Sequence, residues 1–318
     1  MPFLEISPSV RINYTIHQPS APTEKPWVVL INGLADPQTT WAAQTPAFTG
    51  AGYTVLTYDN RGIGLSSRPE SDDEVYTAET MAGDLRSLVT ALKLHVPYHL
   101  MGVSMGGMIA QTYALAYGAS GEIASLTLAC TYAAPGPFCS RMFALWRDMA
   151  QRMSVADVMR DVALWAFTPA CFAVDSVELV AMEADMARID SDMGLRAYLA
   201  QLNVITTFDT RASLGRLGQI TLDVKGGSGV EKLEGAAAAA AAAASKIKTQ
   251  VIVLAGEGDI LIPVYLSREL HAFIPGSRWR TTKGGHACMW EYPDQFNEAC
   301  LEEWRDVDEK IGVARQGM

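Results

Sequence analysis

The sequence predicts an α/β fold: a mostly parallel, doubly wound sheet with helices on both faces and an inserted helical segment. Three observations predict it. Short apolar runs typical of buried strands alternate with amphipathic stretches typical of helices, which is the pattern of a parallel sheet connected through helices. Between residues 137 and 217 this alternation stops and only helical periodicity remains. The chain has 318 residues, 49% of them hydrophobic, which is enough to bury one large core.

The strands and helices of the first half follow one another in a regular order. The continuous apolar run at 27–31 is typical of a buried strand, and the β-branched and aromatic run at 53–58 leads into a turn. Residues 80–94 carry an apolar stripe at helical spacing, with Asp84 off the stripe. Over this half we expect strands at 11–17, 27–31, 53–58, 98–103 and 123–130, and helices at 80–94 and 106–117.

The second half resumes the alternation, so the core is split in sequence. We expect a core of residues 1–134 and 246–318, a helical cap of residues 135–220, and a Gly/Ala-rich segment, 221–245, at their junction. Glycines followed by nine alanines predict that this segment is a loop leading into a short helix. It is a surface insertion without chemistry or, as the alternative, a contact element near the cap. The expected core elements here are strands at 251–255 and 278–282 and helices at 264–273 and 293–308.

Charge and cysteine content exclude several functions. The formal net charge of -10 repels phosphate backbones and anionic headgroups, so neither nucleic acid nor a membrane surface is an expected partner. The first residues lack a basic stretch followed by an apolar one, which argues against a secretory signal. Five cysteines without metal-ligand spacing predict neither disulfides nor a metal site, and favour a reduced, cytoplasmic location.

A serine flanked by glycines is the sharpest chemical signal. Ser104 lies in the motif Gly-Val-Ser-Met-Gly, directly after a predicted strand and directly before a predicted helix. Glycines on both sides remove the Cβ atoms that would collide with the adjoining backbone in such a turn. The turn therefore presents the Ser104 hydroxyl at the carboxyl edge of the sheet as a candidate nucleophile.

A serine nucleophile needs a base and a group that orients the base. His286 follows the last predicted strand in a glycine-supported loop, whereas the other four histidines are expected at surface or capping positions. Asp259 lies on the loop after the strand at 251–255, and Glu257 on the same loop is its competitor. The order Ser104, Asp259, His286 is that of one particular hydrolase fold.

At these motifs the sequence resembles the α/β-hydrolase superfamily over nearly its whole length. The resemblance rests on Asn32-Gly33-Leu34, on the Asp59 to Ser66 turn, and on the motifs around Ser104, Asp259 and His286. Asn32 stands where the family usually has histidine. The resemblance implies an oxyanion hole formed by the backbone amides of Leu34 and Met105, and no cofactor.

The resemblance also narrows the chemistry. A serine at position 104 argues against dehalogenase and epoxide hydrolase chemistry, and the helical insertion is similar to the cap of the lactonase and esterase branch, which includes 3-oxoadipate enol-lactonases. It implies hydrolysis of a small, largely apolar ester or lactone. Hydrolysis of a C–C bond of the β-diketone type, a hydrolase-derived ligand receptor, and a cofactor-free perhydrolase stay open as alternatives. The sequence does not indicate the oligomeric state, and its candidate pocket residues are Trp41, Met108, Trp146, Trp165 and Cys288.

Overall fold

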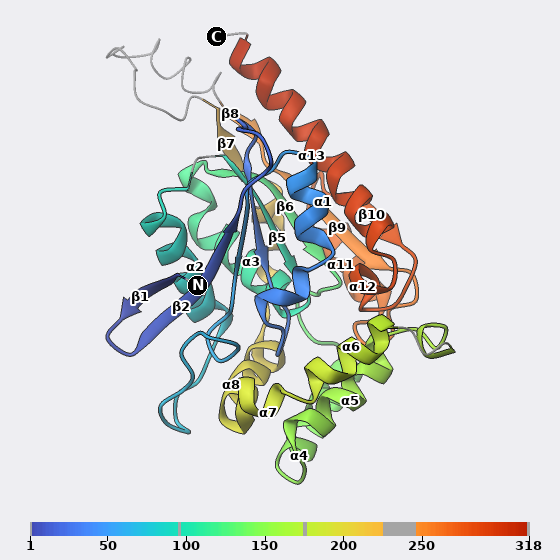
Figure 1. The fold of residues 1–318 in the computed structure, drawn as a ribbon. Coiled ribbons are helices and arrows are strands. Elements are labelled where there is room, and N and C mark those ends of the chain that lie inside the picture. Colours follow the sequence, from blue (N-terminus) through green and yellow to red (C-terminus); the bar gives the residue numbers. More distant parts are fainter. Residues whose placement is uncertain (1, 95–96, 174–176, 225–245, 317–318) are drawn as a thin grey trace.

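An eight-stranded sheet forms the centre of the molecule (Figure 1). The computed structural model describes residues 2–94, 97–173, 177–224 and 246–316. The strand order is β1-β2-β4-β3-β5-β6-β9-β10, in which only the β1/β2 and β2/β4 pairs are antiparallel. The strands are β1 (Phe3–Ser7), β2 (Val10–His17), β3 (Trp27–Ile31), β4 (Val55–Tyr58), β5 (Tyr98–Val103), β6 (Ile123–Ala129), β9 (Gln250–Gly256) and β10 (Arg278–Thr282).

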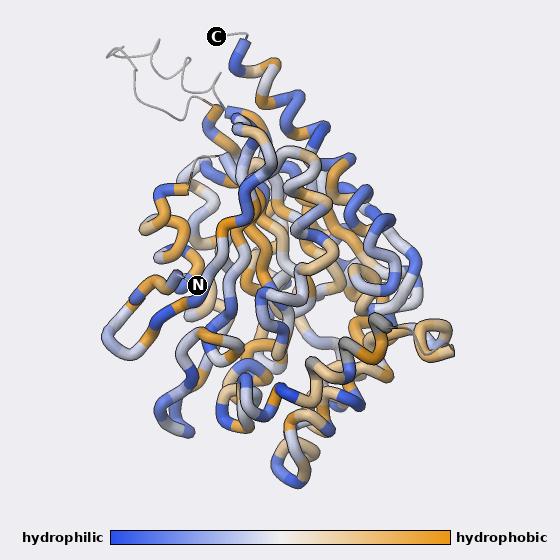
Figure 2. Tube along the Cα trace, in the orientation of Figure 1, coloured by the Kyte–Doolittle hydropathy of each residue, from blue (hydrophilic) through white to orange (hydrophobic). Residues whose placement is uncertain are grey.

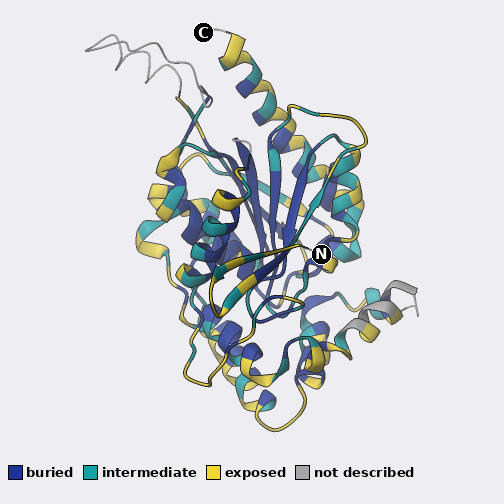
Figure 3. Cartoon of the chain, turned by 60° about the vertical axis from the view of Figure 1, so that its left-hand side comes forward, coloured by how far each residue is buried: buried dark blue, intermediate teal, exposed yellow. Residues whose placement is uncertain are grey.

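Successive residues of each central strand point to opposite faces, and each face packs on its own helices. In β3, Val28 belongs to the cluster that contains Phe48 and Trp304, whereas Val29 belongs to the cluster on the other face. Hydrophobic segments run through the central strands in Figure 2, and these strands are buried along almost their whole length, as the dark blue of Figure 3 shows. The first face is covered by α1 (Gln44–Gly50) and α13 (Pro293–Gln316), the second by α2 (Ala78–Ala91), α3 (Met105–Tyr117) and α11 (Val264–Phe273).

A helical layer lies beyond the carboxyl ends of the parallel strands, at the bottom of Figure 1. It comes from one continuous part of the sequence, between β6 and β9, as the loss of alternation predicts. Its buried side chains belong to the same hydrophobic cluster as the second face of the sheet, so the layer and the core pack as one unit. The helices from this part of the chain are α4 (Pro137–Ala150), α5 (Val155–Ala166), α6 (Val177–Met186), α7 (Ile189–Asp192), α8 (Gly194–Thr207) and α9 (Leu214–Leu217).

The predicted mostly parallel sheet with helices on both faces is confirmed, with two local differences in its strands. The antiparallel β1 is not predicted from the sequence, because its five residues are too few to show a clear strand pattern. Residues 221–223, assigned to the Gly/Ala-rich segment, form the strand β7 (Thr221–Asp223), which pairs with β8 (Lys246–Lys248). The predicted loop and short helix beyond it lie outside the described residues. None of the described helices combines the length and the apolar character needed to cross a bilayer.

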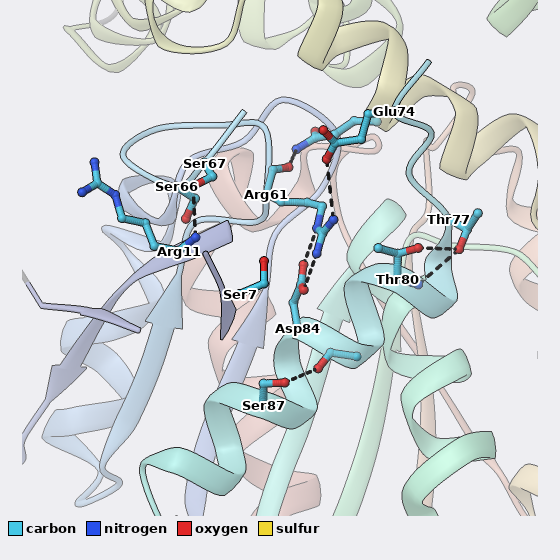
Figure 4. Close-up of polar contacts among 12 residues, drawn as sticks. Ser7, Arg11, Arg61, Ser66, Ser67, Glu74, Thr77, Thr80, Asp84 and Ser87 are labelled. Carbon is cyan, nitrogen blue, oxygen red and sulfur yellow. Dashed lines mark hydrogen bonds and ion pairs between the residues drawn. The ribbon is translucent and has the colours of Figure 1, made fainter. Parts of the chain in front are cut away.

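Helix α2 differs from the sequence prediction in its first residue and in the burial of one polar side chain. It begins at Ala78 rather than at residue 80, because the Thr77 hydroxyl accepts a hydrogen bond from the Thr80 amide and caps the first turn (Figure 4). Asp84, expected off the apolar stripe, is buried. Its carboxylate accepts two hydrogen bonds of 2.6 Å from Arg61, so a specific partner rather than solvent satisfies it.

Candidate active site

Ser104 lies on a sharp turn between β5 and α3. Its φ of 57° and ψ of -120° fall outside the ordinary regions for a side chain of its type, so the surrounding structure must hold the turn. A Cβ on Gly102 would lie 2.0 Å from the Gly106 carbonyl oxygen, and one on Gly106 would lie 2.1 Å from that of Ile31. Both neighbours are backbone atoms, which cannot move aside. The two glycines of the motif are therefore required by packing, as the sequence predicts.

His286 and Asp259 form a hydrogen-bonded pair on adjacent loops at the same edge of the sheet. The Nδ1 atom of His286 lies 2.9 Å from Asp259 Oδ2, and the Asp259 side chain is only 1% exposed. The other carboxylate oxygen of Asp259 accepts a 2.9 Å hydrogen bond from the Ile262 amide, which fixes its orientation. With Nδ1 donating to Asp259, Nε2 is left to accept a proton. Ser104 and His286 line the same cavity.

The competing groups named from the sequence lie elsewhere. Glu257 is exposed and accepts a hydrogen bond from Thr281 on the neighbouring strand. His17 pairs with Thr57 and His271 with Ser277. The expected surface or capping position is wrong for His99, which lies in the central strand β5 and is fully buried between Ser125 and Asp308. His95 lies outside the described residues.

The loop after β3, residues 32–37, carries Leu34, the first proposed oxyanion donor, and is called the oxyanion loop below. Neither the Leu34 nor the Met105 amide donates a hydrogen bond to another described residue, so both are free to bind a substrate oxygen. Asn32, which replaces the usual histidine, anchors the loop: its amide group donates to the Pro37 carbonyl and to Thr40, and its oxygen accepts from the Trp41 indole. Asn32 in place of the usual histidine therefore still provides a hydrogen-bonding side chain that anchors the loop.

A cavity of about 630 Å³ lies between the sheet edge and the helical layer. Ser104, His286 and Leu34 line it, as do two of the predicted pocket residues, Met108 and Trp146. Its other walls are mostly apolar side chains of the helices α4 to α8 and of the loops. A carboxylate, Asp36, and an indole, Trp290, also line it, and the sequence prediction missed both.

The other three predicted pocket residues do not line this cavity. Trp41 is 1% exposed and holds Asn32, and Trp165 packs its ring against Phe138. Cys288 is the first residue of the short helix α12 (Cys288–Glu291) and is fully buried, with its Sγ atom 3.5 Å from that of Cys130. This thiol contact, together with burial, raises the pKa of Cys130 well above its ordinary value, so that thiol stays uncharged and is a poor nucleophile.

Comparison with known proteins assigns the chain to a family. The model of the alpha/beta hydrolase fold family matches residues 26–293. The chain belongs to the α/β-hydrolase family. It is 28% identical over 258 residues to the proline iminopeptidase of Lactobacillus helveticus, which covers 80% of this chain and 81% of that protein.

Solved structures show the same fold. A hydrolase from Pseudomonas aeruginosa PA01 superposes with a TM-score of 0.74 at 24% identity, covering 95% of this chain and 97% of its own. The enol-lactonase from Burkholderia xenovorans LB400 gives 0.72 at 22% identity, covering 95% and 98%. At these identities the two structures support the fold of this hydrolase and not a particular substrate.

Charges around the histidine of this hydrolase favour its protonated form. Burial is the largest single effect and lowers the pKa of His286, but the charge of Asp259, the hydrogen bond to Asp259 and the charge of Asp36 oppose it. Their combined effect raises the pKa of His286 to about 9. Burial raises the pKa of Asp36 to about 7, against the opposing effects of His286 and the Gly33 amide.

We therefore expect activity to rise with pH over an unusually alkaline range. A general base works only when deprotonated, so kcat/KM should rise as the pH approaches about 9 rather than about 6.5. The same shift stabilises the fold below pH 6.5, and this contribution is lost as the pH rises through about 9. A pH profile of kcat/KM on a neutral ester checks the first expectation, and a midpoint at or below 6.5 contradicts it.

Gln201 of α8 connects the helical layer to the oxyanion loop. Its side-chain oxygen accepts a 2.9 Å hydrogen bond from the Ala35 amide, and its side-chain nitrogen donates a 2.8 Å bond to the Arg61 carbonyl. Ala35 has a φ of 61°, which is strained for a residue with a Cβ atom. Arg61 is in turn fixed by Asp84 and lies 3.9 Å from Glu74 (Figure 4). Gln201 thus holds the residue next to Leu34 in its strained conformation.

Replacing Gln201 by leucine should weaken catalysis more than binding. The substitution leaves the buried Ala35 amide without its partner, at a cost of roughly 1–3 kcal/mol in stability, and frees the adjacent Leu34 amide to move. We expect kcat to fall about tenfold, with a smaller change in KM. The matched control is Asn203→Leu on the same helix, because Asn203 donates to the Tyr76 carbonyl and not to the oxyanion loop. Equal kcat in both variants would contradict a positioning role for Gln201.

Proposed function

We propose that this hydrolase cleaves a small, largely apolar ester or lactone through an acyl-enzyme intermediate on Ser104. The observation that carries the proposal is the cavity that Ser104 and His286 both line, with Asp259 hydrogen-bonded to His286. The amides of Leu34 and Met105, on either side of it in the proposal, donate to no other described residue. The walls of the cavity are mostly apolar, which favours a substrate with few polar groups.

In the proposed mechanism His286 removes the proton from Ser104, whose oxygen attacks the carbonyl carbon. Asp259 keeps the imidazole in the required tautomer and stabilises the imidazolium that forms. The Leu34 and Met105 amides donate to the oxyanion, a contribution of about 3 kcal/mol for each donor in comparable sites. The alcohol leaves with the proton from His286, and water activated by His286 then releases the acid.

In this proposal the helical layer is the cap that covers the site. Residues 135–220 would form the cap, and residues 1–134 and 246–318 the catalytic core. Phe143 and Trp146 from α4 and Met159 from α5 line the cavity, so the cap would set the size and shape of the substrate.

A panel of substrates tests the proposal. We expect the wild-type enzyme to hydrolyse short activated esters or lactones, and the Ser104→Ala enzyme to leave them intact. Cleavage of β-diketones but not of esters would replace the proposal by C–C bond hydrolysis. Ligand binding without turnover on any member of the panel would replace it by a receptor role.

A further inference from the structure

A carboxylate lies beside the nucleophile, and the mechanism above gives it no task. Asp36 is three residues after Gly33 on the oxyanion loop, and it lines the same cavity as Ser104. A Cβ built on Gly33 would lie 2.7 Å from Asp36 Oδ2 and 3.5 Å from the Cβ atom of Ser104. The space of one methyl group therefore separates this carboxylate from the nucleophilic residue.

Among the charges of the described residues, that of protonated His286 favours the ionised form of Asp36, and this charge is absent when His286 is neutral and acts as the base. Among the described residues no side chain forms an ion pair or a hydrogen bond with it, and the Gly33 amide is the one group that stabilises its charge by a hydrogen bond. The charged side chains that also line the cavity are Arg188 and Asp192, both from the α7 region, and their formal charges cancel. In the form of the enzyme in which His286 is neutral and can act as the base, the cavity therefore holds an acidic group without a compensating positive charge next to the reacting atoms.

An unpaired negative charge at this place opposes the reaction of a neutral ester. The transition state places negative charge on the carbonyl oxygen, close to the loop that carries Asp36, and like charges in a site of low polarity repel strongly. A positive group on the substrate removes this conflict. It would bind Asp36 in the ground state and would offset the two negative charges in the transition state.

The aromatic walls favour the same kind of group. Trp290 and Phe167 stack on each other with ring centroids 5.9 Å apart, and both line the cavity. The Trp290 indole donates to the Thr40 carbonyl, which places this ring beside the loop that carries Asp36. Aromatic rings that line the same cavity as a carboxylate are suited to an ammonium group, above all a quaternary one.

We propose that Asp36 makes this enzyme select esters with an ammonium group a few bonds from the scissile carbonyl. The inference rests on the proposed ester hydrolysis and names the substrate class of that same site. The substrate would be apolar apart from this one cation, which agrees with the apolar walls.

Two esters of the same shape test the proposal. In 4-nitrophenyl 4-(trimethylammonio)butanoate the cation is a quaternary nitrogen, and in 4-nitrophenyl 5,5-dimethylhexanoate a carbon atom replaces it. We expect wild-type kcat/KM to favour the cationic ester by about tenfold after correction for the uncatalysed rates. Asp36→Asn should remove this preference while it leaves hydrolysis of the neutral ester unchanged or faster. The matched control, Asp192→Asn, removes the other cavity carboxylate and should keep the preference.

The outcomes separate this proposal from the proposed function. Equal kcat/KM for the two esters in the wild type, or an unchanged preference in Asp36→Asn, overturns the role of Asp36 while ester hydrolysis stands.

If neither ester is hydrolysed, the proposed function fails, and a binding experiment still decides the role of Asp36. In that case the N-methylamides of the same two acids are titrated against the Ser104→Ala protein and followed by tryptophan fluorescence. Tighter binding of the cationic amide that is lost with Asp36→Asn supports the proposal, and equal binding overturns it.

Discussion

Replacing Ser104 by alanine should reduce ester turnover by about 10⁴-fold to 10⁶-fold. The substitution removes the only oxygen that can form the acyl-enzyme in the proposed mechanism. It leaves the amides of Leu34 and Met105 in place, so a small residual rate above that of water is expected. Initial rates on 4-nitrophenyl esters measure the effect.

A second serine provides the control for this variant. Ser267 is buried outside the cavity, where its hydroxyl donates to the Thr131 carbonyl. Ser267→Ala should cost about 1 kcal/mol of stability and keep wild-type turnover. Near wild-type turnover in Ser104→Ala would remove Ser104 from the mechanism.

Replacing Asp259 by asparagine should reduce kcat by about 10⁴-fold without unfolding the protein. The asparagine oxygen can still accept from the Ile262 amide, so the loop keeps its shape. The asparagine NH₂ group, however, donates to Nδ1 of His286 and so places the imidazole proton on Nε2. In that tautomer Nε2 cannot accept the proton of Ser104.

The matched control for Asp259→Asn is Glu257→Gln on the same loop. Glu257 is exposed and contacts Thr281, not His286, so its replacement should leave kcat within about twofold. A large loss in Glu257→Gln together with a small one in Asp259→Asn would transfer the orienting role to Glu257.

The sequence predicts the fold because its signals are local. Strand β3 is a continuous apolar run, and the glycines at 102 and 106 are needed where the chain turns between a strand and a helix. The order of Ser104, Asp259 and His286 follows from the positions of three strand ends, which a parallel sheet brings to one edge. Their catalytic roles stay predictions.

The rest of the site depends on contacts between distant parts of the chain. Gln201 is 166 positions from Ala35, whose amide it binds, and nothing in a helical stretch distinguishes this glutamine from others. Trp41 and Trp290 are both tryptophans of loops or short helices, and only the path of the backbone decides that Trp290 lines the cavity while Trp41 anchors Asn32. The sequence could have indicated Asp36, because this carboxylate lies only two residues after Leu34, the proposed oxyanion donor.

Labelling with a fluorophosphonate tests the central claim most directly. The reagent reacts with a serine that is activated by a neighbouring base and leaves a stable adduct on that oxygen. The account predicts one adduct per chain, located on Ser104 by mass spectrometry of the digested protein, with loss of ester turnover in proportion to labelling and no adduct in Ser104→Ala. An adduct on another residue, or full labelling of Ser104 with turnover unchanged, would contradict it.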